Sequence, residues 1–208
     1  MSLTADDIAA TIMRRAEGAR RFLVAIAGPP GAGKSTLAER LAEMLNAAGE
    51  HAVVLPMDGF HIDNGILEDR GLLPRKGAPE TFDVRGFADI VRAVGAGDEE
   101  VLVPVFDRDR EIAIASARSI GTKDRIVLVE GNYLLLDEAP WSGLAPLFDF
   151  SIFVSPSMEE LERRLTARWQ CYKLDASGID WKLNGNDLPN ARLIVENSRP
   201  ADLTIDDF

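Results

Sequence analysis

One nine-residue stretch constrains the chain most, because it matches the phosphate-binding pattern G-x-x-x-x-G-K-[ST]. It reads Gly28-Pro29-Pro30-Gly31-Ala32-Gly33-Lys34-Ser35-Thr36. Glycine lets the backbone approach a phosphate closely, and the amides from Gly31 to Ser35 can point inward as an anion-binding nest. Lys34 can reach the β- and γ-phosphates of a nucleotide, and the Ser35 hydroxyl is placed to bind Mg²⁺. The predicted nucleotide-binding residues are Gly28, Pro29, Gly31, Ala32, Gly33, Lys34, Ser35 and Thr36.

The sequence predicts a strand before this loop and a helix after it. Residues 21–27 form a largely apolar run, typical of a buried parallel strand. After the loop, apolar residues recur at helical spacing as far as about residue 48: Leu37, Leu41, Met44 and Leu45. The alternative is a glycine-rich turn between two ordinary elements. Strand, loop and helix stand in the order that a phosphate-binding loop requires, which favours the phosphate site.

Composition excludes several classes of partner. The 208 residues carry a formal net charge of -11, which argues against a nucleic acid or an anionic membrane surface, whereas ATP needs only a local positive site. Cys171 is the single cysteine, so no disulfide can form within the chain, as is usual in the reducing cytoplasm. Neither a signal peptide nor a membrane-spanning run is recognisable. We therefore expect a cytoplasmic protein with one domain over residues 1–208.

Apolar runs predict an α/β domain in which strands and helices alternate. Besides the first strand, strand-like runs occupy 52–57, 101–106, 126–130, 148–154 and 201–205. Helical patterns occupy 5–19, the stretches that begin near Asp83 and Ser157, and 188–197. Residues 61–83 show weak periodicity and several glycines and prolines, which predicts a loop-rich insertion, and residues 173–187 predict an irregular, mobile loop.

Two aspartates are candidates for binding a phosphoryl acceptor. Asp58 follows the strand-like run 52–57, and ligands of open α/β sheets bind at the carboxyl ends of strands. A carboxylate at this place can accept the proton of an attacking hydroxyl; the alternative is a turn aspartate that caps the next segment. Asp83 precedes a helix and is its N-cap, a ligand of a sugar hydroxyl, or both.

Glu130 is a candidate for binding a metal ion. It ends the apolar run 126–130, which is the place of the Walker B acid that holds Mg²⁺ directly or through water. A buried carboxylate without a cation or hydrogen-bond donors is costly. The sequence therefore predicts a Mg²⁺ site formed by Ser35 and Glu130.

Two arginines lie on the helix that begins near Ser157. Arg168 falls within the apolar stripe of this helix, and Arg164 lies at its edge. An arginine on an inward face needs a partner, which is either a phosphate in the cleft or a carboxylate of the protein.

Two further charged groups have less specific patterns. Residues 107–111 are five consecutive charged residues after a strand-like run, and they predict either a solvated turn or the wall of an acceptor pocket. Arg75 and Lys76 lie in the predicted insertion, and we expect a solvated basic pair, with contact to an anionic group as the alternative.

The chain resembles P-loop small-molecule kinases of the uridine kinase, phosphoribulokinase and bacterial pantothenate kinase group. Within that group it is most similar to short bacterial proteins labelled nucleoside/nucleotide kinase-like or fructose transport system kinase. The resemblance spans nearly the whole chain from Arg21. Besides the loop, it rests on MDGF at 57–60, KGAPETFD at 76–83, PVFD at 104–107, VEGN at 129–132 and the helix with Arg164 and Arg168.

This resemblance implies a three-layer α/β/α domain with a five-stranded parallel sheet in the order 2-3-1-4-5. It implies an acceptor-side insertion at about 59–122 and a lid at about 164–187. By resemblance, Asp58 matches the general base, Glu130 the magnesium-linked acid, and Asp83 a ligand of a sugar hydroxyl. Arg164 and Arg168 match lid arginines, and adenine is expected near 197–201.

The chain departs from uridine kinases at two places. Asp109 and Arg110 stand where those enzymes carry a histidine after P-x-[YF]-D, and His61 stands in place of the tyrosine that follows D-x-F. Both differences weigh against a pyrimidine nucleoside as substrate. The segments that resemble pantothenate kinase are too short to assign that substrate.

We predict a kinase that uses ATP and Mg²⁺ to phosphorylate a hydroxyl of a small metabolite, a sugar or a sugar-containing compound. The expected catalytic residues are Lys34, Asp58, Arg164 and Arg168, and the expected acceptor-binding residues are Asp58, His61, Asp83 and Arg110. The alternatives are a uridine, nucleoside or pantothenate kinase and a nucleotide-dependent regulatory ATPase. The oligomeric state is left open, with a homodimer as one option.

Overall fold

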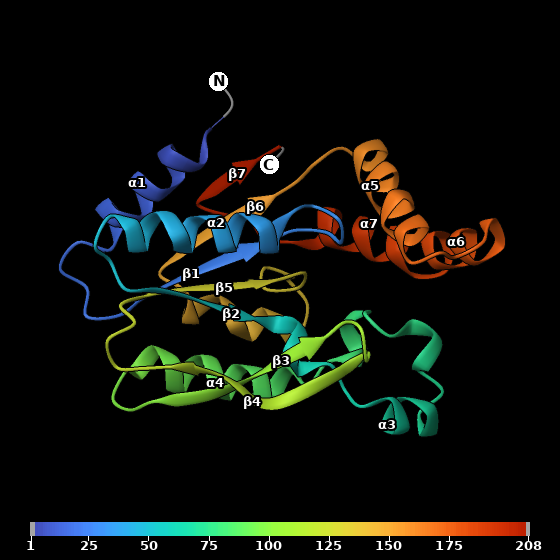
Figure 1. Ribbon diagram of the computed structural model, residues 1–208, viewed down its shortest axis with the longest axis horizontal. Coiled ribbons are helices and arrows are strands. Elements are labelled where there is room, and N and C mark those ends of the chain that lie inside the picture. The colour runs from blue at the N-terminus through green and yellow to red at the C-terminus, as the bar shows by residue number, and fades with distance from the viewer. Residues whose placement is uncertain (1–2, 207–208) are drawn as a thin grey trace.

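The computed structural model describes residues 3–206 and contains a parallel sheet of five strands in the order β2-β5-β1-β6-β7 (Figure 1). The strands are β1 (Phe22–Ala27), β2 (Ala52–Pro56), β5 (Ile126–Gly131), β6 (Phe150–Val154) and β7 (Leu203–Ile205). All four neighbouring pairs are parallel. The predicted α/β class, the five strands and their order are confirmed.

Helices cover both faces of the sheet (Figure 1). The helices α1 (Ala5–Arg15) and α2 (Lys34–Ala47) pack on one face, where Ile12 and Leu41 are completely buried against residues such as Ile26. The other face is covered by α4 (Val84–Ala96) and by the 3-10 segment Trp141–Leu147. The central strands β1 and β5 are buried on both faces, which explains their nearly continuous apolar sequences.

The chain between β2 and β5 forms a long excursion from the sheet. It contains the 3-10 turn Met57–Phe60, α3 (Asn64–Asp69), the 3-10 turns Leu73–Arg75 and Pro79–Thr81, α4, and the strands β3 (Val101–Asp107) and β4 (Ile112–Ile120). The last two pair antiparallel in a separate two-stranded sheet. Strand β4 was not predicted. Nearly all of its residues are exposed, so they carry no hydrophobic alternation that could reveal a strand.

The C-terminal part corrects the prediction of an irregular loop over 173–187. After α5 (Met158–Cys171), the chain forms α6 (Ala176–Lys182), a π-helical turn (Leu183–Asp187) and α7 (Leu188–Asn197). The carboxylate of Asp175 caps α6 by accepting from the amide of Gly178 at 2.8 Å. The glycines and asparagines that suggested a loop lie inside these helical turns. Within residues 3–206, no helix has the length and apolar character that a bilayer crossing demands.

Candidate active site

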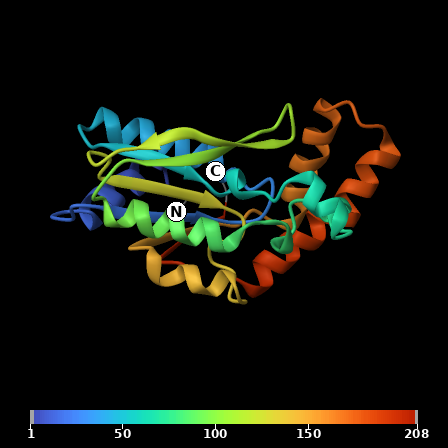
Figure 2. The ribbon, with the colours of Figure 1, turned by 90° about the horizontal axis from the view of Figure 1, so that it is seen from below.

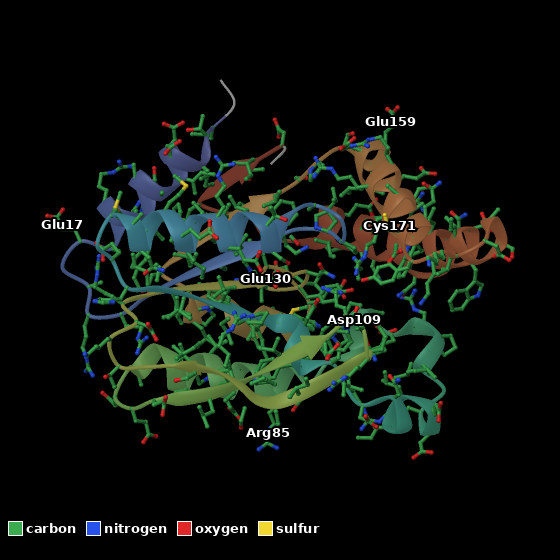
Figure 3. The ribbon with its side chains drawn as sticks, viewed as in Figure 1. Glu17, Arg85, Asp109, Glu130, Glu159 and Cys171 are labelled. Carbon is green, nitrogen blue, oxygen red and sulfur yellow. The ribbon has the colours of Figure 1, made fainter. Side chains whose placement is uncertain are left out.

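The site is built where three neighbouring strands end at the same edge of the sheet. Strand β5 lies between β1 and β2, with Ala27 in register with Gly131 and Pro56 in register with Glu130. The segments that follow the strands therefore meet: the phosphate-binding loop after β1, the 57–60 turn after β2, and the end of β5 itself. Figure 3 shows Glu130 at this edge, between the phosphate-loop side and the β3–β4 hairpin.

The phosphate-binding loop holds its lysine inward. Gly33 precedes α2 with a φ of 95°, a left-handed conformation that glycine adopts without steric cost. The side chain of Lys34 is buried, and its Nζ donates to the carbonyl of Pro29 at 2.8 Å. Burial lowers the pKa of Lys34 to about 8, although the carboxylates of Glu130 and Asp58 oppose this shift. The ammonium therefore faces the same small space as both carboxylates.

Ser35 and Glu130 are brought together as predicted. The hydroxyl of Ser35 donates to Oε2 of Glu130 at 3.2 Å, and Glu130 is only 7% exposed. Burial and the nearby charge of Asp58 raise the pKa of Glu130 to about 7. A carboxyl group in such surroundings favours a cation beside it, and a carboxylate with a hydroxyl is a donor set that suits Mg²⁺. Among residues 3–206, no cluster of three or more His, Cys, Asp or Glu side chains could hold a metal, so any ion here would have few protein ligands.

Asp58 lies at the carboxyl end of β2 and is paired with an arginine that was not predicted. Nη2 of Arg108 donates to Oδ2 of Asp58 at 2.5 Å. Burial raises the pKa of Asp58, but nearby positive charge, above all that of Arg108, outweighs it, and the net shift is downward. Asp58 is therefore an ionised carboxylate and a potential proton acceptor at neutral pH.

The turn that carries Asp58 packs directly on the hairpin. A Cβ at Gly59 would lie 2.3 Å from the carbonyl oxygen of Pro104 in β3, so only glycine fits here. The carboxylate of Asp107 accepts from the amides of Asp109 and Arg110, which fixes the turn that presents Arg108. The five charges at 107–111 thus form a turn, and one of them also lines the site.

Arg110, predicted to bind the acceptor, lies on this same turn. Its guanidinium pairs with Asp107 at 3.6 Å and is 71% exposed, and it is Arg108 that contacts Asp58. The structure thus places Arg108, and not Arg110, beside Asp58, and nothing in five consecutive charges says which side chain faces the sheet.

Asp83 and His61 flank the site on the excursion. The carboxylate of Asp83 accepts from the amide of Gly86 at 2.9 Å and is the N-cap of α4, one of its two predicted roles. The His61 ring lies between Phe82 and Phe106, with centroid distances of 4.1 and 4.6 Å. Nδ1 of His61 lies 2.7 Å from the carbonyl oxygen of Asp58. Burial lowers the pKa of His61, which favours the neutral imidazole.

Arg164 and Arg168 of α5 approach the phosphate-binding loop. Nε of Arg164 donates to Glu160 at 2.6 Å, and Nη1 reaches the carbonyl of Ala32 at 3.4 Å. The guanidinium of Arg168 lies over the ring of Trp169, 5.5 Å from its centroid, and its charge helps to lower the pKa of Lys34. Within residues 3–206, Arg168 forms no ion pair with a carboxylate. Arg164 thus has the salt bridge that was the alternative to a phosphate partner, whereas the described part of the chain offers Arg168 the ring of Trp169.

Arg75 and Lys76 are not the solvated pair that was expected. The side chain of Lys76 is 14% exposed, and its ammonium donates to Asn64 at 2.7 Å and to the carbonyl of Glu111 at 2.8 Å. The guanidinium of Arg75 donates to Gly185 and Asn190. Both side chains join the excursion to other parts of the molecule.

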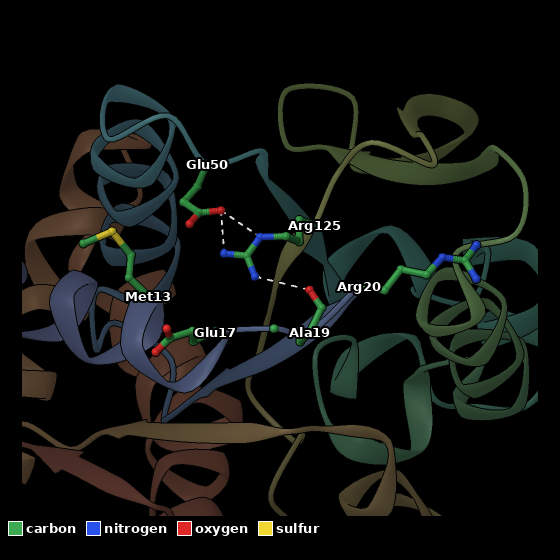
Figure 4. Close-up of a pocket in the computed structure, with 7 residues that line it drawn as sticks. Met13, Glu17, Ala19, Arg20, Glu50 and Arg125 are labelled. Atoms are coloured by element: carbon green, nitrogen blue, oxygen red, sulfur yellow. Dashed lines mark hydrogen bonds and ion pairs between the residues drawn. The ribbon is translucent and has the colours of Figure 1, made fainter.

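A hollow of about 460 Å³ lies at the opposite edge of the sheet from the candidate site (Figure 4). Its walls come from residues that precede β1, β2 and β5, including Ala19, Glu50 and Arg125. The guanidinium of Arg125 is used within the protein, by Glu50 at 2.6 Å and by the carbonyls of Ala16 and Ala19. This hollow therefore lies away from the phosphate-binding loop, and its charged groups serve the fold.

Comparisons with known proteins agree with this geometry. The model of the phosphoribulokinase/uridine kinase family matches residues 23–168, which include the loop, Asp58, Glu130, Arg164 and Arg168. This chain belongs to that family. As a member, it is a kinase that uses a nucleotide and phosphorylates a hydroxyl of a small molecule.

Individual relatives point to several substrates. The crystal structure of a protein provisionally named fructose transport system kinase from Silicibacter sp. TM1040 is 46% identical, with a TM-score of 0.93, and the match covers 97% of this chain and 98% of that one. A provisionally named uridine kinase of Schizosaccharomyces pombe is 32% identical over 89% of this chain and 83% of its own length. The pantothenate kinase of Streptomyces coelicolor is 35% identical over 68% of this chain, but the match covers only 46% of that enzyme.

Proposed function

We propose that this protein transfers the γ-phosphate of ATP to a hydroxyl of a small sugar or sugar-containing metabolite. The observation that carries the proposal is the meeting of Asp58, Lys34 and Glu130 at one edge of the sheet, with Asp58 ionised and facing the phosphate-binding loop. Phosphoryl transfer needs positioning and neutralisation of charge more than covalent chemistry. This arrangement of one base, one buried cation and one metal-linked acid meets both needs.

Each residue has a distinct role in the proposed reaction. The amides of the loop and the Lys34 ammonium bind the phosphates, and Lys34 exchanges its bond to the Pro29 carbonyl for a phosphate oxygen. Asp58 orients the acceptor hydroxyl and takes its proton. Arg164 and Arg168 stabilise the negative charge that develops on the transferred group. Ser35 and Glu130 would hold Mg²⁺, which when bound neutralises charge on the β- and γ-phosphates.

The acceptor is proposed to bind between the 57–60 turn and the excursion, close to Asp83 and His61. The ring of His61 is packed between two phenylalanines and is not free to stack on a nucleobase. This supports a compact, hydroxyl-bearing acceptor over a pyrimidine nucleoside, in agreement with the name of the Silicibacter relative. We place the enzyme in the cytoplasm, where ATP and such metabolites are available.

The test is ADP release coupled to an indicator reaction, with Mg²⁺ and ATP, against hexoses including fructose, nucleosides, pantothenate and a control without acceptor. Acceptor-dependent ADP release by one class identifies the substrate, and Lys34→Ala should abolish it because the ammonium that binds the phosphates is lost. Equal release with and without every acceptor would indicate a regulatory ATPase and contradict the proposal.

A further inference from the structure

Three consecutive residues, Arg75, Lys76 and Gly77, join three parts of the molecule that lie far apart in the sequence. We call them the 75–77 junction. Figure 2 shows the segment around α3 beside the helices of the C-terminal part. The hydrogen bonds of the junction account for this arrangement.

The first connection is to the π-helical turn and the start of α7. Nη1 of Arg75 donates to the carbonyl of Gly185 at 3.0 Å, and Nη2 donates to Oδ1 of Asn190 at 3.2 Å. Nδ2 of Asn186 donates to the carbonyl of Lys76 at 2.8 Å, and Nδ2 of Asn190 donates to Asn186 at 3.0 Å. Both asparagines are buried, at 7% and 2% exposure. Buried amides with satisfied hydrogen bonds fix a single arrangement, because moving them leaves polar groups unpaired.

The other two connections are to the hairpin and to the sheet. Lys76 binds the carbonyl of Glu111, in the same turn as Arg108. The hydroxyl of Tyr133, just after β5, donates to the carbonyl of Gly77 at 2.6 Å. The junction thus touches the turn that reaches Asp58 and the segment that follows β5, the strand that carries Glu130.

A chain of contacts leads from the π-helical turn to α5, the helix next to the phosphate-binding loop. Asp187, next to Asn186, accepts from Nε1 of Trp169 at 2.6 Å. Trp169 lies on α5, and its ring carries the guanidinium of Arg168. A π-helical turn adds a residue to the helical repeat and is often found at functional sites. Here the π-helical turn places Asn186 against the junction and Asp187 against α5, which carries Arg164 and Arg168.

We propose that the 75–77 junction transmits nucleotide binding to the acceptor side, with Arg75 and Asn186 as positioning residues. This inference rests on the proposed function, since it assumes that α5 responds to phosphates in the loop. Coupling between two sites is reciprocal, so the same contacts make acceptor binding favour the nucleotide-bound arrangement. The segment with α6 is then not a lid that moves alone, but part of a unit with the excursion.

The experiment is hydrogen–deuterium exchange of the full chain with and without Mg²⁺ and the non-hydrolysable ATP analogue AMP-PNP. In the wild type, the analogue should slow exchange in the loop at 28–36. It should also slow exchange in the two distant segments, 61–83 and 107–113, by about fivefold or more. In Asn186→Ala and Arg75→Gln, slowing at 28–36 should persist while slowing in 61–83 and 107–113 is lost. Asn184→Ala is the matched control, because this exposed asparagine bonds only to Asp180 of α6 among the hydrogen bonds described, and it should behave as the wild type.

Unchanged exchange of β5 in each variant shows that the sheet is intact. If Asn186→Ala unfolds the protein, Arg75→Gln still tests the proposal, because it changes a partly exposed side chain. If the analogue protects 28–36 but not 61–83 in the wild type, or if both variants keep the distant protection, the junction does not transmit binding. Absence of protection at 28–36 in the wild type would contradict the proposed function instead.

Discussion

The guanidinium of Arg108 and the carboxylate of Asp58 form an ion pair at 2.5 Å across 50 residues of sequence. Arg108 comes from the exposed hairpin turn and is 45% exposed, whereas Asp58 is 23% exposed. A hydroxyl that approaches Asp58 must share the carboxylate with this arginine. The pair keeps the proposed base ionised.

Replacing Arg108 should shift the pH dependence of activity. Arg108 is the main influence that lowers the pKa of Asp58 against the opposing effect of burial, so Arg108→Gln should raise that pKa. A base works only when it is deprotonated, and activity is lost as the pH falls through its pKa. The acidic limb of kcat/KM should therefore move to higher pH in Arg108→Gln. Arg110→Gln, on the same turn but paired with Asp107, should keep the wild-type profile.

Asp58→Asn should lower kcat by about 10²–10⁴-fold, because the amide orients a hydroxyl but cannot take its proton. Binding of AMP-PNP, measured by calorimetry, should change little, since Asp58 has no direct contact with the phosphate-binding loop among the hydrogen bonds described. Near-normal turnover with the acceptor that the substrate panel identifies would remove Asp58 from the mechanism.

Two substitutions at Asp83 separate its cap from its proposed role as an acceptor ligand. Asp83→Ala removes the N-cap of α4 and should cost about 1 kcal/mol of unfolding free energy. Asp83→Asn keeps a good capping residue, so stability should be preserved, but loss of the charge should raise KM for the acceptor. A KM for Asp83→Asn equal to that of the wild type would make Asp83 a cap alone.

Glu130→Gln should stabilise the nucleotide-free protein at high pH. The pKa of Glu130 is about 7 in the fold and near 4.5 in an unfolded chain, so the unfolded state releases its proton first as pH rises. The wild type therefore loses stability between these two values, by about 1–3 kcal/mol, and glutamine avoids this loss. Urea unfolding at pH 5 and pH 8 measures the difference, which should be larger at pH 8. The same variant should need more Mg²⁺ for activity.

The local patterns predicted much of the fold and part of the site. The loop at 28–36, the five parallel strands and the carboxylates at the ends of β2 and β5 could be predicted, because each is encoded within a few neighbouring residues. Strand β4 could not be, since its exposed residues show no alternation. Helix α6 and the π-helical turn after it were hidden by glycines and asparagines that also favour loops. The pairing of Arg108 with Asp58 and of Asn186 with the carbonyl of Lys76 joins residues 50 and 110 positions apart, and no local spacing signals such contacts.

The strand order has an evolutionary consequence. Because β2 and β5 are neighbours in the sheet, all residues between Pro56 and Ile126 form one uninterrupted stretch whose ends are fixed by the sheet. Helix α4 within this stretch is tied to the core, but its loops and the exposed strand β4 can change in length and sequence at small cost to stability. A new substrate preference can thus arise by replacing one contiguous piece of gene, while the ATP-handling half of the enzyme is inherited unchanged.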